Sequence, residues 1–336
     1  MRSFGNIVVF HPGAIGDVML ATPVASTLKL NFPGAKLTYW THPGLRPILL
    51  GLCPFIDEVV DYKREDNFFQ LAKTYENLRS DLFVDLANST KSHAMTWLTR
   101  SKVLRYEKES PHIRPIKHAV TNFLDTVRPV CDELPDPLFP TIFPETLTDS
   151  VLDPFFEHHE HRSVPFIGLV PGVGKLRPHR AWLHDGWLYL IEHILSWKSH
   201  LPVLIGGSDE HELCAELNAS AGGRALNVAG RLSLAETAAV LKQCQVVVSS
   251  DTGPAHIAVA VGTKVIGLYG PTFPQRSGPF GCMDLVLDES SNCRCHDQKH
   301  CRFAQPHAPG DCMRRIMLEE IIRTLKMLLF NEHLHQ

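Results

Sequence analysis

The sequence has no long apolar run and no strong excess of charge of either sign. No segment approaches the ~20 consecutive apolar residues of a membrane-spanning helix, and the opening residues MRSFGNIVVFHPG are too soon interrupted by polar residues for a signal peptide. The formal net charge is −3 over 336 residues, which argues against a general nucleic-acid-binding protein. We therefore expect a cytoplasmic protein that binds no nucleic acid.

The length and composition indicate two globular domains. The 336 residues exceed one average domain, and 44% apolar with 21% charged residues is typical of folded proteins. Residues 129–154 lack clear periodicity and carry six prolines, at positions 129, 135, 137, 140, 144 and 154. We take this stretch as a linker. The predicted domains are 1–160, which includes the linker, and 161–336.

Predicted strands and helices alternate in both halves, which indicates an α/β fold with parallel sheets. In the first half the predicted strands are 7–10, 37–40 and 81–85, and the predicted helices are 17–31 and 67–79. In the second half the predicted strands begin at 166, 202, 246 and 264, and the predicted helices are 185–198, from 210, 234–243, from 253 and 318–329. The chain therefore predicts two Rossmann-like domains.

Three polar turns follow strands of the second domain, where open parallel sheets bind ligands. They read PGVGK at 171–175, GGSDE at 206–210 and SSDTGPAH at 249–256. In the last turn, Asp251 and Thr252 precede a helix start at Gly253, where backbone N–H groups and the helix dipole would hold a diphosphate. The alternative is that Asp251 or Thr252 only caps the helix.

The first strand leads into HPGAIGDVMLATP at 11–23, a glycine-bearing turn without the full G-x-G-x-x-G pattern. Gly13 and Gly16 would let the backbone turn tightly, and Asp17 would then stand in the first turn of a helix. A carboxylate there serves as a general base or simply complements the helix dipole. The residues alone leave both readings open.

Three of these segments together resemble the heptosyltransferases of glycosyltransferase family 9. They are GAIGDVMLATPV at 13–24, LIGGSDE at 204–210 and DTGPAHIAVAVGTKVIGLYGPTFP at 251–274. The resemblance covers nearly the whole chain. It implies a GT-B fold, in which two Rossmann-like domains face each other across a cleft, with the acceptor bound by the N-terminal domain and an ADP-sugar by the C-terminal domain.

The resemblance also implies a role for individual residues. Asp17 matches the general base. Glu210 matches an acid on the donor ribose, and Leu232 would lie beside the adenine. The motif RPHRAW places Arg180 where the family has a lysine that contacts the phosphates, and Lys175 competes for that role. The implied donor-binding residues are Gly13, Gly16, Arg180, Glu210, Leu232, Asp251, Thr252, Gly253 and His256.

The implied reaction is inverting transfer of heptose from ADP-heptose to the lipopolysaccharide inner core, with no cofactor required for the chemistry. The acceptor is anionic, and residues 90–128 hold eight Lys or Arg against three acids. Lys91, Arg100 and Arg105 are therefore acceptor-binding candidates, although a solvated helix face would look the same. Peripheral contact with the inner face of the inner membrane is also expected.

Other functions fit the same pattern. A relative could modify another polysaccharide or a protein, and a GT-B protein could be a sugar-nucleotide epimerase. A non-catalytic nucleotide-binding module would keep the turn at 249–256 but would not need Asp17.

The nine cysteines fall into two groups. Those at 53, 131, 214, 244 and 282 are scattered and are predicted to be buried apolar residues. Cys293, Cys295, Cys301 and Cys312 are close in sequence, which suggests a structural zinc or iron site or, alternatively, reduced or redox-active thiols. The histidine-rich segment HHEHR at 158–162 is a weaker metal candidate.

Overall fold

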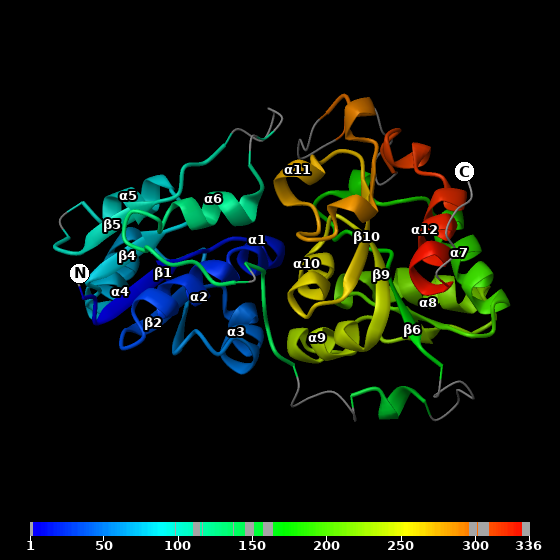
Figure 1. Ribbon diagram of the computed structural model, residues 1–336, viewed down its shortest axis with the longest axis horizontal. Coiled ribbons are helices and arrows are strands. Elements are labelled where there is room, and N and C mark those ends of the chain that lie inside the picture. Colours follow the sequence, from blue (N-terminus) through cyan, green and yellow to red (C-terminus); the bar gives the residue numbers. More distant parts are fainter. Residues whose placement is uncertain are drawn as a thin grey trace. The chain divides into compact units, whose positions relative to one another are not determined.

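The computed structural model describes residues 3–97, 99–109, 115, 117–136, 138–144, 151–156, 164–295, 301 and 309–330. The described residues before 110, together with 117–143, form one compact unit, and those from 144 onward, with Pro115, form a second. We call them unit 1 and unit 2. Each unit contains its own parallel sheet with helices around it (Figure 1). The two-domain α/β prediction is therefore confirmed.

The division falls earlier than the predicted boundary at 160/161. Two contacts tie residues 151–156 to unit 2. The Phe156 ring stacks on the Phe166 ring with 5.9 Å between centroids, and the Arg231 guanidinium lies 4.2 Å above the centre of the Phe155 ring. This part of the proline-rich stretch therefore packs with unit 2.

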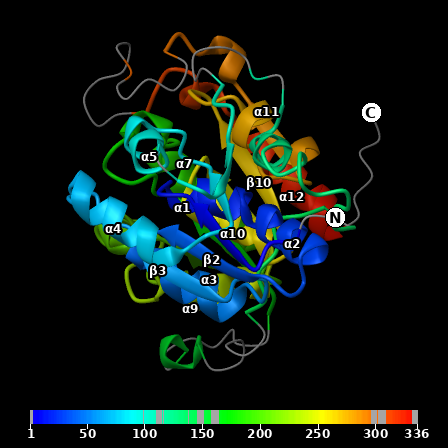
Figure 2. The ribbon, with the colours of Figure 1, turned by 90° about the vertical axis from the view of Figure 1, so that its left-hand side faces the viewer.

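Unit 1 has five parallel strands in the order β3-β2-β1-β4-β5. The strands are β1 (Asn6–Phe10), β2 (Lys36–Thr41), β3 (Glu58–Asp61), β4 (Leu82–Asp85) and β5 (Lys102–Arg105). The helices are α1 (Ile15–Leu20), α2 (Thr22–Asn31), α3 (Arg46–Leu52), α4 (Phe68–Leu78), α5 (Thr90–Met95) and α6 (Ala119–Asp125). In Figure 2, α4 and α5 lie together on one side of this sheet and α2 on the other.

The helix predicted at 17–31 is in fact two helices. α1 ends at Leu20, Ala21 follows, and α2 begins at Thr22 with Pro23 in its first turn. Proline has no N–H to donate to the preceding turn, so it begins a helix more easily than it continues one. The predicted single helix was therefore wrong at this position.

The core of unit 1 beneath α4 and α5 is aromatic. The Phe10 ring lies 4.9 Å from Trp40 and 6.1 Å from Phe83, measured between centroids. Leu71 and Tyr75 of α4 complete this cluster. Strands covered on both faces are apolar along their length rather than alternating, and β1 follows this rule with NIVVF.

Unit 2 has six parallel strands in the order β11-β10-β9-β6-β7-β8. The strands are β6 (Phe166–Val170), β7 (Leu201–Leu204), β8 (Leu226–Asn227), β9 (Cys244–Ser250), β10 (Lys264–Tyr269) and β11 (Val286–Asp288). The helices are α7 (His184–Ser196), α8 (His211–Ser220), α9 (Leu234–Gln243), α10 (Gly253–Ala260), α11 (Pro274–Ser277) and α12 (Leu318–Phe330).

Both sheets reverse their strand order at one point, between β1 and β4 in unit 1 and between β6 and β9 in unit 2. Loops that leave neighbouring strands on the two sides of such a point diverge, and ligands bind in the crevice at the carboxyl ends of those strands. The fold thus selects one edge of each sheet as a candidate site.

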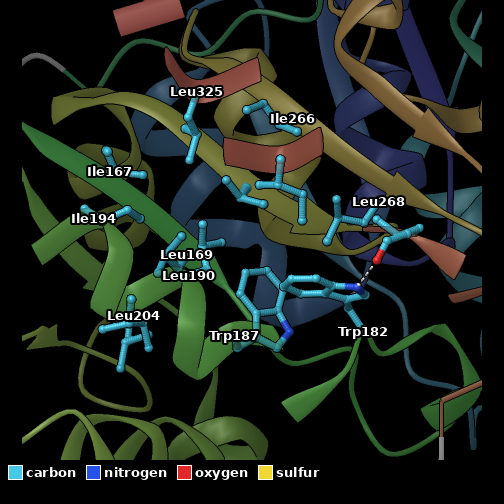
Figure 3. Close-up of a cluster of buried hydrophobic side chains, with 14 of the residues drawn as sticks. Ile167, Leu169, Trp182, Trp187, Leu190, Ile194, Leu204, Ile266, Leu268 and Leu325 are labelled. Carbon is cyan, nitrogen blue, oxygen red and sulfur yellow. Dashed lines mark hydrogen bonds between the residues drawn. The ribbon is translucent and has the colours of Figure 1, made fainter. Parts of the chain in front are cut away.

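Two tryptophans anchor α7 in the core of unit 2 (Figure 3). The Trp182 and Trp187 rings meet edge to face with 5.3 Å between centroids. Trp182 Nε1 donates a 3.0 Å hydrogen bond to the Ile316 carbonyl, which joins the start of α7 to the segment before α12. Trp187 Nε1 is also buried, but it has no hydrogen-bond partner among the described residues.

These tryptophans give a matched test of buried hydrogen bonding. Trp182→Phe leaves the Ile316 carbonyl without its hydrogen-bond donor, whereas Trp187→Phe removes an N–H that has no partner among the described residues. We expect Trp182→Phe to lower the unfolding free energy of unit 2 by about 1–2 kcal/mol more than Trp187→Phe. Urea unfolding followed by circular dichroism measures the difference, and equal losses in the two variants would contradict the assignment.

Candidate functional site

The carboxyl end of β9 in unit 2 carries Asp251. Thr252 follows at the N-cap position of α10, but its side chain makes no capping hydrogen bond, and its hydroxyl instead lies 3.0 Å from Ser249 Oγ. Neither Asp251 nor Thr252 therefore caps the helix with its side chain, so the simple capping alternative does not describe this turn. The first turn of α10, which begins at Gly253, keeps N–H groups that no side chain caps.

Asp251 is held by two cationic or polar side chains. Arg180 Nη1 lies 3.0 Å from Asp251 Oδ2 and 3.3 Å from the Asp251 carbonyl oxygen, and His256 Nε2 lies 3.5 Å from Asp251 Oδ1. Burial by itself raises the pKa of Asp251, but Arg180, His256 and the Thr272 hydroxyl outweigh it and lower that pKa to about 2. The carboxyl group is thus ionised at neutral pH.

Two buried polar atoms beside this cluster have no hydrogen-bond partner among the described residues. They are Ser250 Oγ and His256 Nδ1. Buried polar groups are nearly always paired, so two orphans at the switch point indicate a place for a polar ligand or water. This is the strongest sign of a binding site in unit 2.

Glu210 joins two of the glycine-bearing turns. Its Oε2 accepts a 2.8 Å hydrogen bond from the Gly207 N–H, and its Oε1 accepts a 3.0 Å hydrogen bond from the Gly174 N–H. A Cβ at Gly172 would lie 1.9 Å from Glu210 Cγ, so only glycine fits there. Each carboxylate oxygen keeps a second lone pair that can accept a hydroxyl.

Arg180 and Lys175 lie in different surroundings. Lys175 is exposed and its Nζ pairs with Asp209 Oδ1 at 2.7 Å, whereas Arg180 is largely buried against Asp251. Arg180 is thus the cation that the structure brings to the end of β9. Leu232 is half-buried between β8 and α9, next to the Ser233 cap of α9.

In unit 1, the turn after β1 places Asp17 in the first turn of α1. Ala14 occupies the N-cap position without a side-chain hydrogen bond, and Asp17 is exposed at the third helical residue. Gly13 and Gly16 are not among the described glycines with positive φ. Glycine is needed at position 13 because the neighbouring side chains lie close to its backbone. A Cβ there would lie 2.9 Å from His11 Nε2 and 3.2 Å from Asp17 Cβ.

His11 was not among the residues predicted from the sequence. Its ring is buried, packs 5.2 Å from Phe123, and has an Nδ1 without a hydrogen-bond partner among the described residues. Burial, with a contribution from Lys108, lowers the pKa of His11 to about 3. The imidazole beside the Asp17 turn is therefore neutral.

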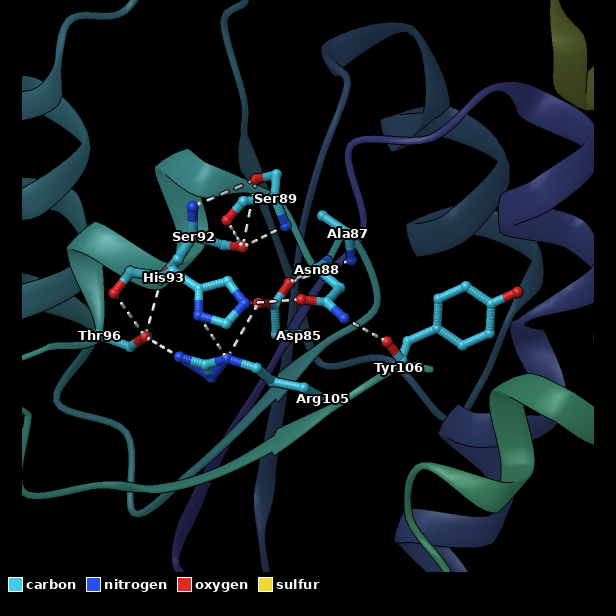
Figure 4. A network of polar contacts seen from close by, with 9 residues as sticks. All are labelled: Asp85, Ala87, Asn88, Ser89, Ser92, His93, Thr96, Arg105 and Tyr106. Atoms are coloured by element: carbon cyan, nitrogen blue, oxygen red, sulfur yellow. Dashed lines mark hydrogen bonds and ion pairs between the residues drawn. The ribbon is translucent and has the colours of Figure 1, made fainter. Parts of the chain in front are cut away.

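A polar network at the end of β4 was also not predicted from the sequence (Figure 4). The fully buried Asp85 stands opposite Phe10 in the sheet, and its Oδ1 accepts hydrogen bonds of 3.1 and 2.9 Å from the Ala87 and Asn88 N–H groups. Asn88, at φ 40°, donates to the Tyr106 carbonyl and lies 2.7 Å from His93 Nε2. Only the sheet register reveals that this network adjoins the His11 turn.

The three basic candidates do not form one patch. Arg105 belongs to the network in Figure 4, where it donates to Thr96 Oγ1 at 2.5 Å and lies 4.0 Å from Asp85 Oδ2. Lys91 lies near the same edge, in the first turn of α5. Arg100 precedes β5 and therefore lies at the opposite edge of the sheet. Any acceptor that reaches Arg105 and Lys91 would have to be extended to reach Arg100.

The late cysteines lie close together. Cys293 Sγ is 3.5 Å from Cys295 Sγ. Burial raises the pKa of Cys295, and the neighbouring thiols of Cys293 and Cys301 raise it further. A hydrogen bond to Cys293, together with burial, raises the pKa of Cys312. Among the described residues, however, no group of three or more His, Cys, Asp or Glu forms a complete ligand set. The HHEHR segment at 158–162 lies outside the described residues.

The five scattered cysteines are buried, as predicted, and no disulfide joins any of the nine, all of which lie in the described part of the chain. No helix in the described ranges combines the length and apolarity needed to cross a bilayer.

Two parallel-sheet units with switch-point sites are the architecture of GT-B proteins. The structure of Escherichia coli ADP-heptose lipopolysaccharide heptosyltransferase II matches with a TM-score of 0.74 at 21% identity, over 97% of this chain and 99% of that one. The iron-containing dodecameric glycosyltransferase TibC of enterotoxigenic E. coli matches with a TM-score of 0.59 at 12% identity, over 99% and 78%. The GT-B prediction is confirmed.

The sequence identifies the family. The model of glycosyltransferase family 9 (heptosyltransferase) matches residues 64–307, so the chain belongs to that family and is a glycosyltransferase. Lipooligosaccharide heptosyltransferase 2 of Haemophilus influenzae is 25% identical over 308 residues, which cover 84% of this chain and 88% of the relative.

The Asp251 cluster predicts a specific acid response. An aspartate whose folded pKa is lowered to about 2 contributes stability above its unfolded pKa of ~3.9, and that contribution is lost as the pH falls through about 2. We expect about 2 kcal/mol of unfolding free energy to disappear over this window. Urea unfolding at stepped pH should show a shallower loss for Asp251→Asn.

Asp209→Asn is the matched control, because the exposed Lys175–Asp209 pair should contribute little. The same acid slope in Asp251→Asn and in the unmodified protein would show that Asp251 is not a strongly stabilised carboxylate.

Proposed function

We propose that this glycosyltransferase moves heptose from ADP-heptose to the lipopolysaccharide inner core with inversion at the sugar carbon. The observation that carries the proposal is the Asp251–Arg180–His256 cluster with its two orphan polar atoms at the N-terminus of α10. A nucleoside diphosphate sugar supplies both the anionic groups and the hydroxyls that such a site would bind. The names of the relatives support the sugar and the acceptor.

In the donor site, the diphosphate would accept hydrogen bonds from the first turn of α10, beginning at Gly253, and from Arg180. Arg180 is preferred to Lys175 because Asp251 already orients its guanidinium, and a planar guanidinium suits two phosphate oxygens at once. Thr252 and His256 would face the phosphates and the sugar. Glu210 would accept ribose hydroxyls at the free lone pairs of its carboxylate, with Leu232 beside the adenine.

In the chemical step, an acceptor hydroxyl attacks the anomeric carbon as the ADP leaves from the opposite side. The hydroxyl proton must go to a base, and we assign this role to Asp17. Asp17 lies in the amino-terminal turn of α1, where the helix dipole favours a negative charge. Gly13 and Gly16 belong to the turn that carries it, and the neutral His11 packs beneath.

The acceptor residues would be Lys91 and Arg105, near the edge where β4 and β5 end, with Arg100 contacting a more distant anionic group. Other acceptors, such as a different polysaccharide or a protein, remain outcomes of an acceptor screen. ADP-heptose turnover against acceptors with zero, one and two inner-core heptoses distinguishes them. An isomerised sugar nucleotide without any acceptor would instead reveal an epimerase.

Asp17→Asn tests the catalytic assignment. We expect kcat to fall by roughly two to four orders of magnitude, the usual effect of removing a positioned base, while calorimetry shows unchanged ADP affinity. Asp209→Asn provides an activity control, because that exposed carboxylate pairs with Lys175. If Asp17→Asn keeps more than about a tenth of kcat when chemistry limits the rate, Asp17 only complements the helix dipole.

We also propose that Cys293, Cys295, Cys301 and Cys312 hold one structural zinc or iron ion. Four thiolates around a tetrahedral zinc, with Zn–S of about 2.3 Å, lie about 3.8 Å apart, close to the 3.5 Å between Cys293 Sγ and Cys295 Sγ. TibC, with the same fold, is iron-containing by its description. The metal would stabilise the loop and take no part in glycosyl transfer.

Elemental analysis of protein purified without chelator should find about one ion per chain. Cys295→Ser should lose the metal and unfold at a lower temperature, whereas Cys131→Ser, at a scattered cysteine, should keep it. A metal-free protein with unchanged stability would remove the proposal.

A further inference from the structure

The charged cluster around Asp251 is built from segments that lie far apart in the sequence. Arg180 ends a short helical turn ahead of α7, whereas Asp251 follows β9. Thr272, whose hydroxyl helps to lower the pKa of Asp251, comes after β10. The structure therefore has to hold two further segments, those of Arg180 and Thr272, against the end of β9.

A short segment before α12 contacts the chain around Arg180 at two points. The Gly310 N–H donates a 3.1 Å hydrogen bond to the carbonyl of His179, the residue before Arg180. The Ile316 carbonyl accepts the 3.0 Å hydrogen bond from Trp182 Nε1, two residues after Arg180 (Figure 3). These hydrogen bonds restrain the chain immediately before and after Arg180.

The same segment packs on Gly270, two residues before Thr272. A Cβ at position 270 would lie 2.9 Å from Cys312 Sγ and 2.7 Å from Met313 Sδ, so both sulfur atoms rest directly on the glycine backbone. Cys312 and Met313 are themselves buried. We call residues 310–316 the brace, because they join the Arg180 segment to the Thr272 segment.

The first residue of the brace has little space around it. A Cβ at Gly310 would lie 3.2 Å from the His179 carbonyl oxygen and 3.3 Å from Cys312 Sγ. Gly310 is not among the described glycines with positive φ, so alanine can adopt its backbone conformation. An alanine there would therefore act by crowding the His179 carbonyl and not by straining its own backbone.

The brace is also part of the cysteine cluster. The thiols of Cys312 and Cys293 share a hydrogen bond, and Cys293 Sγ lies 3.5 Å from Cys295 Sγ. Cys312 thus contacts the other clustered cysteines on one side and Gly270 on the other. The cluster is therefore connected to the backbone that carries Arg180.

We propose that the brace positions Arg180 for the donor diphosphate, so that the packing of the cysteine cluster sets the affinity for the donor. A planar guanidinium that binds two phosphate oxygens tolerates little displacement, and a shift of about 1 Å can cost about a hundredfold in a positioned site. Asp251 restrains the guanidinium, whereas the brace restrains the backbone behind it. Gly310 and Cys312 are thus positioning residues that act through Arg180.

The inference rests on the proposed donor site but requires no metal in the cysteine cluster. Its test is calorimetry of ADP binding to the full chain. Gly310→Ala should raise the Kd for ADP about tenfold, because it displaces the His179 carbonyl and Arg180 with it.

Two control variants should leave ADP affinity unchanged. Val240→Ala opens a cavity in α9, outside the buried cluster to which Cys312 and Met313 belong, and so destabilises unit 2 without touching the brace. Gly51→Ala places a Cβ in open space in α3 and controls for the glycine substitution itself.

A double-mutant cycle separates positioning from general destabilisation. Arg180→Ala should itself weaken ADP binding, and in that background Gly310→Ala should cause no further loss, because the brace acts through Arg180. Additive losses would overturn the proposal, since Gly310 would then act independently of Arg180.

Trp182→Phe tests the other end of the brace without adding an atom. It removes the hydrogen bond to the Ile316 carbonyl and should weaken ADP binding about threefold more than Trp187→Phe. Thermal unfolding checks that each variant is folded, and this pair decides the question if Gly310→Ala does not fold.

The failure of the brace and the failure of the donor site give different results. Unchanged ADP affinity in Gly310→Ala and Trp182→Phe, with weakened binding in Arg180→Ala, would overturn the role of the brace and leave the donor site in place. Unchanged affinity in Arg180→Ala would overturn the proposed donor site, and the role of the brace with it.

Discussion

The reversal of strand order in each sheet is the constraint on which both candidate sites depend. Parallel strands are joined by helical crossovers, so every connection returns the chain to the amino edge and leaves the polar turns at the carboxyl edge. Where β9 pairs with β6, this brings the Asp251 turn beside the turn that follows Val170. Where β4 pairs with β1, it brings Asp85 beside Phe10 and the His11 turn. In neither case are the two segments adjacent in the sequence.

The sequence predicted what depends on local pattern. The helix at 234–243 has the predicted bounds, and the apolar runs that became β1, β6, β9 and β10 were recognised. The prediction of one helix over α1 and α2 was wrong, because Pro23 in the first turn of α2 separates the two helices. The short strands β3 and β5 were not predicted. The Asp85 network could not be predicted from the sequence, because Asp85, His93 and Arg105 come from β4, α5 and β5 and meet only once the sheet has formed. The same limit applied to Arg180, whose motif was visible but whose contact with Asp251 was not.

Stability alone does not explain the buried charges at these edges. Taking a carboxylate out of water costs several kcal/mol, and its ion pair often only balances that cost, so apolar replacements of a complete pair can be as stable. Asp251 stays ionised because Arg180 and His256 compensate for its burial, yet Ser250 Oγ and His256 Nδ1 beside it are unsatisfied within the described protein. A buried ion pair whose polar neighbours are incompletely hydrogen-bonded is better explained by a ligand that completes the cluster.

The low pKa of Asp251 also argues against a role for that carboxylate as the catalytic base. A base must accept a proton during each turnover, and it does so best when its pKa is not far below the working pH. Asp251, with a pKa of about 2, is bound so firmly to Arg180 that protonating it at neutral pH would be costly. It is therefore suited to orient Arg180 and to accept hydroxyl hydrogen bonds, but not to take up the acceptor proton. Asp17, by comparison, is exposed in the first turn of α1, and the proposed mechanism therefore assigns proton transfer to unit 1 and donor binding to unit 2.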